Sequence, residues 1–395
     1  MKYVVLIVDG ASGWPVESLG NKTSLEAAST PNLDQMARRA TVGMAGTVPE
    51  KMEPSSACAC MSVLGYNPKV FYKGRAAIEA RSLDIPIAAD ETVFRANLVT
   101  IEGGKMRDYS AGHIDSNESA ALIKFLNEKL GTPDLTLFPG VGYRHILKLR
   151  NRPESLSAIC TPPHDISDQS IENYLPKGQG ADILRSIMAA SAELLKDHPI
   201  NIARIARGEL PATQLWLFWG SGPLPNMPSF KDRYGLSAAI TSGVDLLRGL
   251  GQMQGMDVMC INGVTDNTDN DYALQMEEAL KALDIYDMAV VHVEAPDEAG
   301  HAGNAEEKVK AIEMIDRDMV GRLREYKGDK LRVLIMPDHP TPLKIRTHAS
   351  EMVPFLIWGS GVRTSGARRF TEAEARNTKL VVAEAHNIMS MVVRG

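Results

Sequence analysis

Aspartate and histidine residues recur in this sequence just after apolar stretches. The motif V-V-L-I-V-D-G contains Asp9, A-P-D-E-A-G-H contains Asp297 and His301, and M-P-D-H-P contains Asp338 and His339. One more histidine, His348, follows the last motif. Mixed carboxylate and imidazole ligands suit Zn²⁺, Mn²⁺ or a similar ion better than Ca²⁺, which prefers oxygen atoms alone. The pattern therefore predicts a site for divalent metal.

Three apolar runs must position these side chains. Val4–Val8, Met288–Val293 and Leu331–Met336 are β-type runs, and the first is continuously apolar, as expected of a strand that is covered on both faces. In an open α/β sheet, ligands collect at the carboxyl ends of the strands. We therefore expect an α/β fold in which three strand ends bring the aspartates and histidines together. His292, inside the second run, is expected to be a hydrogen-bonded core histidine rather than a ligand.

Two serines precede a run of small apolar residues. Glu53-Pro54-Ser55-Ser56-Ala57 leads into Cys58–Leu64, which predicts a loop that presents both serines at a helix N-terminus, where backbone N–H groups favour phosphate. Two metal ions about 4 Å apart are a recurrent solution for phosphoryl displacement, and such a site also activates a serine as nucleophile. Ser56 is the expected nucleophile and Ser55 the alternative.

A further helix is expected to begin near Thr30-Pro31-Asn32. Threonine is a good N-cap and proline suits the first turn, while the apolar residues that follow share one helical face: Leu33, Met36 and Ala37.

The bulk properties restrict the class of protein. A chain of 395 residues favours two domains, and a net charge of −6 argues against nucleic acid as a partner. Apolar runs are too short for a membrane span, the start of the chain does not look like a secretion signal, and four cysteines do not form a disulfide framework. We therefore expect a cytoplasmic protein with reduced cysteines, in which Cys58 and Cys60 are half-buried thiols rather than metal ligands.

The middle of the chain differs in texture. Short strands such as Phe94–Ile101 and Tyr143–Leu149 alternate with polar loops, and Trp216–Gly220 then returns to a buried strand. The metal-type residues lie outside this middle segment. We expect a discontinuous domain formed by residues 1–78 and 211–395, with residues 79–210 inserted, the second boundary being good to about 25 residues.

Several motifs, taken in order, resemble a known family. They are a D-G pair near the N-terminus, T-P-N-L-D at 30–34, L-G-Y-N-P at 64–68, G-R at 74–75, A-P-D-E-A-G-H at 295–301 and the later D-H pair. Together they resemble the alkaline-phosphatase superfamily and, within it, the archaeal-type cofactor-independent (2,3-bisphosphoglycerate-independent) phosphoglycerate mutases, over essentially the whole chain. The resemblance implies a mostly parallel sheet sandwiched by helices, with a smaller inserted α+β domain.

The resemblance also implies two divalent metal ions. Mn²⁺ is favoured, with Zn²⁺, Co²⁺ and Mg²⁺ as alternatives. One ion would be held by Asp297, His301 and His348. The other would be held by the remaining members of the family pattern: Asp9, Asp338, His339 and the oxygen of Ser56.

The implied substrate is a small phosphorylated acid. Ser56 would take the phosphoryl group from 3-phosphoglycerate and return it to the other hydroxyl of the bound glycerate, giving 2-phosphoglycerate. The inserted domain would clamp the substrate carboxylate and exclude water. Candidates for this clamp are Arg75, Arg95, Arg144, His164 and Asp165, and Asp108 is a candidate for moving a proton between the substrate hydroxyls.

Two departures from the family pattern keep other functions open. The usual Gly-Ser-Asp at the nucleophile is Ser55-Ser56-Ala57 here, and a run of the type Asp-Arg-Arg-Ala-Gly-Arg reads Asp108-Tyr109-Ser110-Ala111-Gly112-His113. The alternatives are a phosphotransferase on the same scaffold, such as a homoserine kinase, a phosphomonoesterase, or a metal-stabilised protein without activity. The kinase phosphate loop G-x-x-x-x-G-K-[ST] does not occur, and the oligomeric state is not predicted.

Overall fold

The chain consists of two compact units. A computed structural model describes residues 1–394; unit 1 joins Met1–Tyr72 to the segment that starts at Met227, and unit 2 is Lys73–Asn226. The first unit is discontinuous in sequence, as the expected insertion requires. The insertion begins at Lys73 rather than at residue 79 and ends at Asn226 rather than at residue 210.

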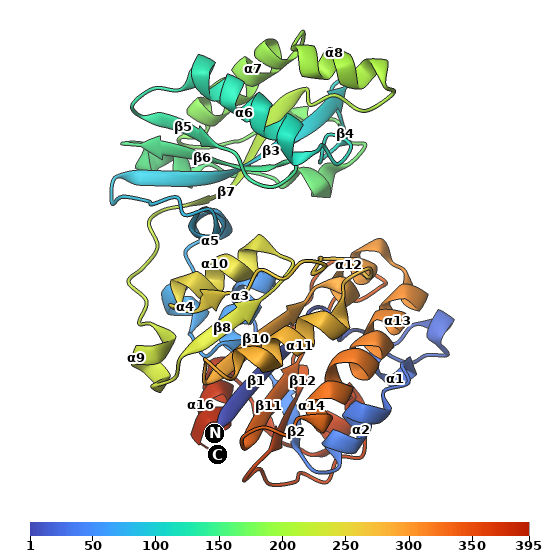
Figure 1. Ribbon diagram of the computed structural model, residues 1–395. Coiled ribbons are helices and arrows are strands. Elements are labelled where there is room, and N and C mark those ends of the chain that lie inside the picture. Colours follow the sequence, from blue (N-terminus) through green and yellow to red (C-terminus); the bar gives the residue numbers. More distant parts are fainter. Residues whose placement is uncertain (395) are drawn as a thin grey trace. The chain divides into compact units, whose positions relative to one another are not determined.

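Unit 1 contains a central sheet of eight strands (Figure 1). All neighbours are parallel except the two pairs that involve β12, which are antiparallel. In spatial order the strands are β13 (Val381–Val382), β2 (Thr41–Ala45), β12 (Val353–Gly359), β11 (Leu331–Met336), β1 (Lys2–Val8), β10 (Met288–Val293), β8 (Ala238–Thr241) and β9 (Asp257–Val258). The expected α/β fold with a mostly parallel sheet is confirmed.

Helices lie on both sides of this sheet. The helices of unit 1 are α1 (Ser24–Ala27), α2 (Pro31–Ala37), α3 (Ser56–Val63), α4 (Pro68–Phe71), α9 (Phe230–Tyr234), α10 (Asp245–Met253), α11 (Tyr272–Ala282), α12 (Ala295–Ala302), α13 (Ala305–Ile315), α14 (Gly321–Glu325), α15 (Glu372–Asn377) and α16 (Ile388–Arg394). Shorter helical turns are η1 (Glu17–Leu19), the π-helical η5 (Asp316–Val320) and η6 (Ala385–Asn387).

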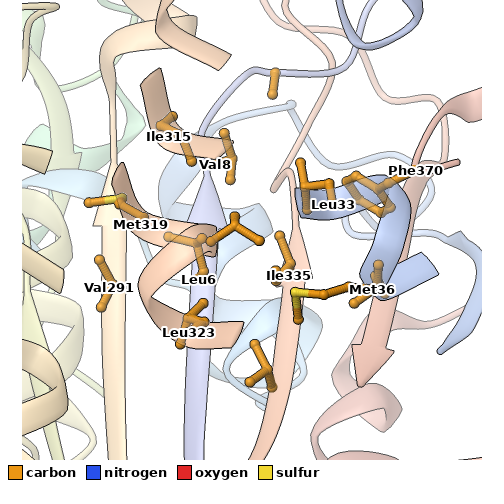
Figure 2. Close-up of a cluster of buried hydrophobic side chains, with 14 of the residues drawn as sticks. Leu6, Val8, Leu33, Met36, Val291, Ile315, Met319, Leu323, Ile335 and Phe370 are labelled. Carbon is orange, nitrogen blue, oxygen red and sulfur yellow. The ribbon is translucent and has the colours of Figure 1, made fainter. Parts of the chain in front are cut away.

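Both faces of β1 are buried, which explains its continuously apolar sequence. On one face, Leu6 packs in a cluster with Met319 and Leu323 of the η5–α14 region (Figure 2). The residues that point to the other face, Val5 and Ile7, are equally inaccessible to solvent. Burying such a side chain contributes roughly 1.5–3 kcal/mol, so covering both faces fixes this strand firmly as the centre of the sheet.

Helix α2 is capped from a distant part of the chain. Thr30 occupies the N-cap position, but its side chain makes no capping hydrogen bond, contrary to expectation. Instead, Asp316 of η5 accepts hydrogen bonds from the backbone N–H groups of Leu33, at 2.7 Å, and Asn32, at 3.1 Å. A buried carboxylate therefore serves as the anion at this helix N-terminus.

Unit 2 has its own antiparallel sheet of five strands. They are β4 (Lys105–Asp108), β3 (Glu91–Glu102), β6 (Arg144–Arg150) and β5 (Leu135–Phe138) in order, with β7 (Gln214–Ser221) paired to the other side of β3. Its helices are α5 (Arg75–Ser82), α6 (Ser116–Leu130), α7 (Ala181–Leu195) and α8 (Pro199–Ala206), with short turns η2 (Pro153–Ser157), η3 (Pro163–Ile166) and η4 (Glu172–Tyr174).

The strand at residues 216–220 corrects one expectation. It was expected to resume the first domain, but Trp216 and Phe218 of β7 pair with Asn97 and Arg95 of β3. An apolar run reports that a strand is buried and does not report which sheet it joins.

Among the described residues, no helix is both long and apolar enough to cross a membrane.

Candidate metal centre

Three neighbouring strands bring the predicted ligands to one edge of the unit 1 sheet. β1 lies between β10 and β11 and runs parallel to both, with Val8 beside Val293 and Ile7 beside Met336. The segments that leave the three strands therefore start side by side. They carry all six predicted aspartate and histidine ligands: Asp9 after β1, Asp297 and His301 on α12 after β10, and Asp338, His339 and His348 after β11.

The first group of ligands consists of Asp297, His301 and His348. The Nε2 atom of His301 lies 3.0 Å from Asp297 Oδ2 and 3.0 Å from His348 Nε2, and His348 Nε2 lies 3.6 Å from Asp297 Oδ2. Three ligands at tetrahedral metal bond lengths of 2.0–2.1 Å stand about 3.3 Å from one another. The spacing of these three side chains is therefore compatible with the first set of ligands that the family resemblance implies.

The second group consists of Asp9, Asp338, His339 and Ser56. His339 Nε2 lies 3.2 Å from Asp338 Oδ2, 3.6 Å from Asp9 Oδ1 and 3.2 Å from the hydroxyl of Ser56. The aspartates and the histidine are completely buried, and Ser56 is almost so. All four expected partners of the second ion are therefore in one place.

The two serines have different surroundings. Ser55 is the N-cap of α3, and its side chain accepts a hydrogen bond from the N–H of Cys58. Ser56 is the first residue of the helix, with its hydroxyl directed at His339. The capping bond occupies Ser55, so the geometry favours Ser56 as the nucleophile.

The charge of this cluster calls for a cation. Burial, followed by the charges of Asp338, Glu294 and Asp297, raises the pKa of Asp9 well above its usual value. Asp9 Oδ1 is buried and has no hydrogen-bond partner among residues 1–394. Buried carboxylates without partners are costly unless they bind metal. The orphaned oxygen and the mixed donor set therefore fit divalent ions.

The histidines divide into two electrostatic classes. Burial lowers the pKa of His339 to about 4, which keeps this ring neutral, as a metal ligand must be. Burial also acts to lower the pKa of His301, but the hydrogen bond and charge of Asp297 outweigh it and raise the pKa to about 9. The carboxylate thus holds His301 in place, and metal binding there would release a proton.

Several residues that support the ligands were not found from the sequence. Thr341 donates a hydrogen bond to Asp297 Oδ1, and Gly10 has a φ of +60°, where any side chain would collide with Asp297 and Thr341. Cys60 lies 3.5 Å from Asp338 Oδ2. Cys58 and Cys60 are fully buried rather than half-buried. The D-G pair was the one visible signal of this close packing.

In unit 2, Arg75 and Arg95 share one carboxylate. Glu79 accepts a hydrogen bond from Arg75 Nε at 2.8 Å and another from Arg95. Arg95 is buried and also donates to Asn97 at 2.9 Å, so the structure uses it in an internal ion pair. Arg75 is more exposed, and its guanidinium lies 4.2 Å from the ring centre of Trp219.

The other clamp candidates lie near aromatic rings of the same unit. The Arg144 guanidinium is 5.3 Å from the ring centre of Tyr143, and the His164 ring is 5.7 Å from that of Trp219. Asp165 is exposed, with Oδ1 3.8 Å from His164 Nε2. Their role in binding a substrate stays a prediction.

Asp108 has an evident local role. Its Oδ1 atom accepts hydrogen bonds from the N–H and hydroxyl of Ser110 and from the N–H of Gly112. These bonds stabilise a turn in which Ala111 and His113 adopt positive φ values of 51°, an uncommon conformation for residues with a side chain. Asp108 therefore shapes the turn that departs from the family pattern, and its proton-transfer role stays a prediction.

Comparison with known proteins identifies the family. A family model described as 2,3-bisphosphoglycerate-independent phosphoglycerate mutase matches residues 37–201. Proteins of that name from Methanothrix thermoacetophila and Methanosarcina acetivorans are 44% and 41% identical to this chain, over 100% of both sequences in each case. The chain belongs to this family. The resemblance found from the motifs is confirmed.

Solved structures share the fold of this chain. A protein from Pyrococcus horikoshii superposes with a TM-score of 0.84 at 26% identity, covering 100% of this chain and 96% of the other. The cofactor-independent phosphoglycerate mutase from Thermoplasma acidophilum gives a TM-score of 0.65 at 24% identity, covering 100% and 99%. At this identity, the second likeness shows the fold alone.

Proposed function

We propose that this chain interconverts 3-phosphoglycerate and 2-phosphoglycerate without 2,3-bisphosphoglycerate, through a phosphoserine at Ser56. The observation that carries the proposal is the position of the Ser56 hydroxyl, 3.2 Å from His339 Nε2, within the second group of expected ligands; His339 also lies close enough to Asp297 and His348 of the first group to share an ion with them. Two relatives with the name of this enzyme align with this chain over their full lengths.

The residues of unit 1 divide the work of the reaction. Ser56 Oγ loses its proton and attacks phosphorus, the bond from phosphorus to the C3 oxygen breaks, and that oxygen takes up one proton, which leaves phosphoserine and glycerate. The C2 hydroxyl then loses its proton and attacks the phosphoserine, the bond from phosphorus to Ser56 Oγ breaks, and the serine oxygen takes up one proton, so the two steps together consume and release no net proton. Divalent ions held by the two groups would polarise the phosphoryl oxygens and lower the pKa of the serine hydroxyl. The N-terminus of α3 adds backbone N–H groups for the phosphate.

For the substrate carboxylate we propose the basic residues of unit 2. Arg75 and Arg144 are the strongest candidates, because both are arginines next to aromatic rings, and guanidinium groups bind carboxylates in a bidentate manner. Arg95 then acts by fixing Glu79 and, through it, Arg75. His164, Asp165 and Asp108 complete the proposed set.

The metal and the compartment are also proposals. We propose Mn²⁺, because the two groups combine carboxylate and imidazole donors. A cytoplasmic location is supported by the four cysteines, all of which are free thiols, as is usual in a reducing compartment. A role in glycolysis follows from the proposed reaction alone.

An enolase-coupled assay of the Mn²⁺-loaded protein on 3-phosphoglycerate, without 2,3-bisphosphoglycerate, tests the proposal. Formation of phosphoenolpyruvate is expected, and Ser56→Ala should abolish it while the fold persists. Ser55→Ala is the matched control, since loss of a cap costs about 1 kcal/mol and should spare turnover. Equal activity in wild type and Ser56→Ala would remove Ser56 as nucleophile.

One observation favours a second candidate, a phosphotransferase such as a homoserine kinase. The turn at Asp108–His113 contains no arginine, although it stands where the family pattern has three. A folded, metal-loaded protein that is silent with 3-phosphoglycerate but phosphorylates homoserine with ATP would establish this alternative. Release of phosphate alone would indicate a phosphomonoesterase.

A further inference from the structure

The three aspartates of the metal centre are held in the same manner. In each carboxylate, one oxygen is held by hydrogen-bond donors of the protein and the other faces a histidine, although Asp338 Oδ2 also lies 3.5 Å from the thiol of Cys60. Asp297 Oδ1 is held by the Thr341 hydroxyl, and Asp338 Oδ1 is held by the N–H groups of Gly10, at 3.2 Å, and His339, at 2.8 Å. Their Oδ2 atoms are the ones that approach a histidine Nε2.

Asp9 follows this arrangement through a buried histidine. Its Oδ2 atom lies 2.7 Å from Nε2 of His292, while its Oδ1 atom has no hydrogen-bond partner in residues 1–394 and lies 3.6 Å from His339 Nε2. His292 belongs to β10 and is almost completely inaccessible to solvent. The side chain that holds Asp9 is therefore an imidazole, where the other two aspartates use a hydroxyl or backbone N–H groups.

The other nitrogen of His292 continues the chain of hydrogen bonds. His292 Nδ1 lies 2.9 Å from the hydroxyl of Ser242, and that hydroxyl accepts a hydrogen bond from the backbone N–H of Val244 at 3.0 Å. The strand that carries His292 is also anchored, because the Gln275 side chain donates to the His292 carbonyl at 3.1 Å. Ser242 follows β8, the next strand beyond β10.

The direction of these bonds follows from the donors available. An ionised carboxylate only accepts, so His292 Nε2 must carry the proton when Asp9 is ionised. A neutral imidazole then has no proton on Nδ1, and this nitrogen accepts a hydrogen bond from the hydroxyl of Ser242. The Ser242 oxygen in turn accepts from Val244. Each hydrogen bond of this relay then has one donor and one acceptor without a charge on the imidazole. Glu294 Oε2 also lies 3.4 Å from His292 Nε2, but it accepts no hydrogen bond from the described residues.

We propose that His292 is a positioning residue that engages Asp9 Oδ2 and leaves Oδ1 as the metal-binding oxygen, with Ser242 fixing the tautomer of the ring. This inference rests on the proposed function, because it needs the second metal ion. His292 itself is not a ligand, although Asp9, Cys60 and His292 lie close enough to hold an ion as a group. Partners that orient a ligand in this way typically change metal affinity 10–100-fold when they are removed.

The metal affinities of four variants test the inference. Zn²⁺ is titrated against a chelator, with the fold checked by circular dichroism. His292→Leu should weaken one of two ions about tenfold or more, and His292→Gln should recover part of the loss, since an amide can donate to Asp9. Ser242→Ala should weaken the same ion although Ser242 does not contact a ligand. His145→Gln is the matched control: His145 is equally buried, lies in unit 2 and binds the N–H of Gly140, so both affinities should stay unchanged.

Nitrogen NMR of the wild-type Zn²⁺-loaded protein is a second readout that does not need any variant to fold. We expect His292 as the neutral tautomer with its proton on Nε2. A metal-bound Nε2, or a proton on Nδ1, would overturn the inference. If His292→Leu and Ser242→Ala both leave the Zn²⁺ affinities of the two sites unchanged, the inference is overturned while the proposed function stays intact. A wild-type protein that binds no divalent ion would overturn both.

Discussion

The ammonium of Lys308 donates a hydrogen bond of 2.7 Å to the carbonyl oxygen of Thr341. The Lys308 side chain has no solvent exposure. A second bond reaches the carbonyl of Ser12 at 3.3 Å. Thr341 follows β11 and Ser12 follows β1, so one buried cation joins the two loops that carry Asp9 and Asp338. Lys308 thus links the loops that carry these candidate ligands through hydrogen bonds to backbone carbonyls.

Lys308→Met should destabilise unit 1 and weaken metal binding. The methionine fills similar space but leaves the buried carbonyl of Thr341 without its donor, which costs about 1–3 kcal/mol, whereas the Ser12 carbonyl keeps the N–H of Thr341. Chemical denaturation of the metal-free protein, followed by metal titration, measures both effects. Lys310→Met is the control, because Lys310 is exposed on the same helix, and its change should stay within about 0.5 kcal/mol. Equal effects of the two substitutions would contradict the role of Lys308.

His301→Ala should reduce the metal content from two ions to one. The His301 ring lies 3.0 Å from both Asp297 Oδ2 and His348 Nε2, so its removal leaves the first group with two ligands. Metal analysis after gel filtration measures the stoichiometry. His386→Ala, a histidine of the same unit that pairs only loosely with Glu384, should retain two ions. A full complement in His301→Ala would refute the assignment of this ligand.

Glu79→Gln should destabilise unit 2 strongly. Glu79 is the shared partner of Arg75 and the buried Arg95, and removing one partner of a buried ion pair costs about 3–5 kcal/mol. Hydrogen exchange of β3 peptides reports the loss locally. Glu278→Gln is the control, because Glu278 pairs with Lys281 at the surface, where such pairs contribute about 0–1 kcal/mol. A loss in Glu79→Gln no larger than in this control would show that the pair is not needed.

Unit 2 should lose stability as the pH falls. Burial acts to raise the pKa of Glu79, but Arg95 and Arg75 outweigh it and lower the pKa from 4.5 to about 2. Its contribution is therefore complete above pH 4.5 and is lost as the pH falls through about 2. Burial, helped by Arg95, lowers the pKa of His145 from 6.5 to about 3, so its contribution is lost as the pH falls below 6.5.

Tryptophan fluorescence can follow this acid loss within unit 2. Trp216 and Trp219 lie in this unit, so replacing Trp14 and Trp358 by phenylalanine isolates their signal. Each shift of one pKa unit corresponds to about 1.4 kcal/mol, so the Glu79 contribution amounts to at most about 3 kcal/mol. His145→Gln should flatten the decline between pH 6.5 and 4. A decline of the same slope in that variant would exclude His145 as its source.

Local patterns in the sequence predicted the residue types that gather at the candidate metal centre. Apolar runs that end shortly before Asp9, Asp297 and Asp338 predicted three buried strands and their common edge, and the neighbours of Ser56 predicted that it lies at a helix start. These features depend on residues close in sequence, because strand burial and helix starts are decided by the adjacent side chains.

The tertiary structure alone decided which distant parts of the chain contact one another, both in the fold and at the candidate site. The pairing of β7 with β3, the cap that Asp316 gives to α2, and the contact of His292 with Asp9 join segments that are far apart in sequence. A pattern of apolar and polar residues reports that a side chain is buried, but it does not report its partner. A buried polar group must find a hydrogen-bond partner wherever the folded chain provides one, so these partners emerge only when the sheet has assembled.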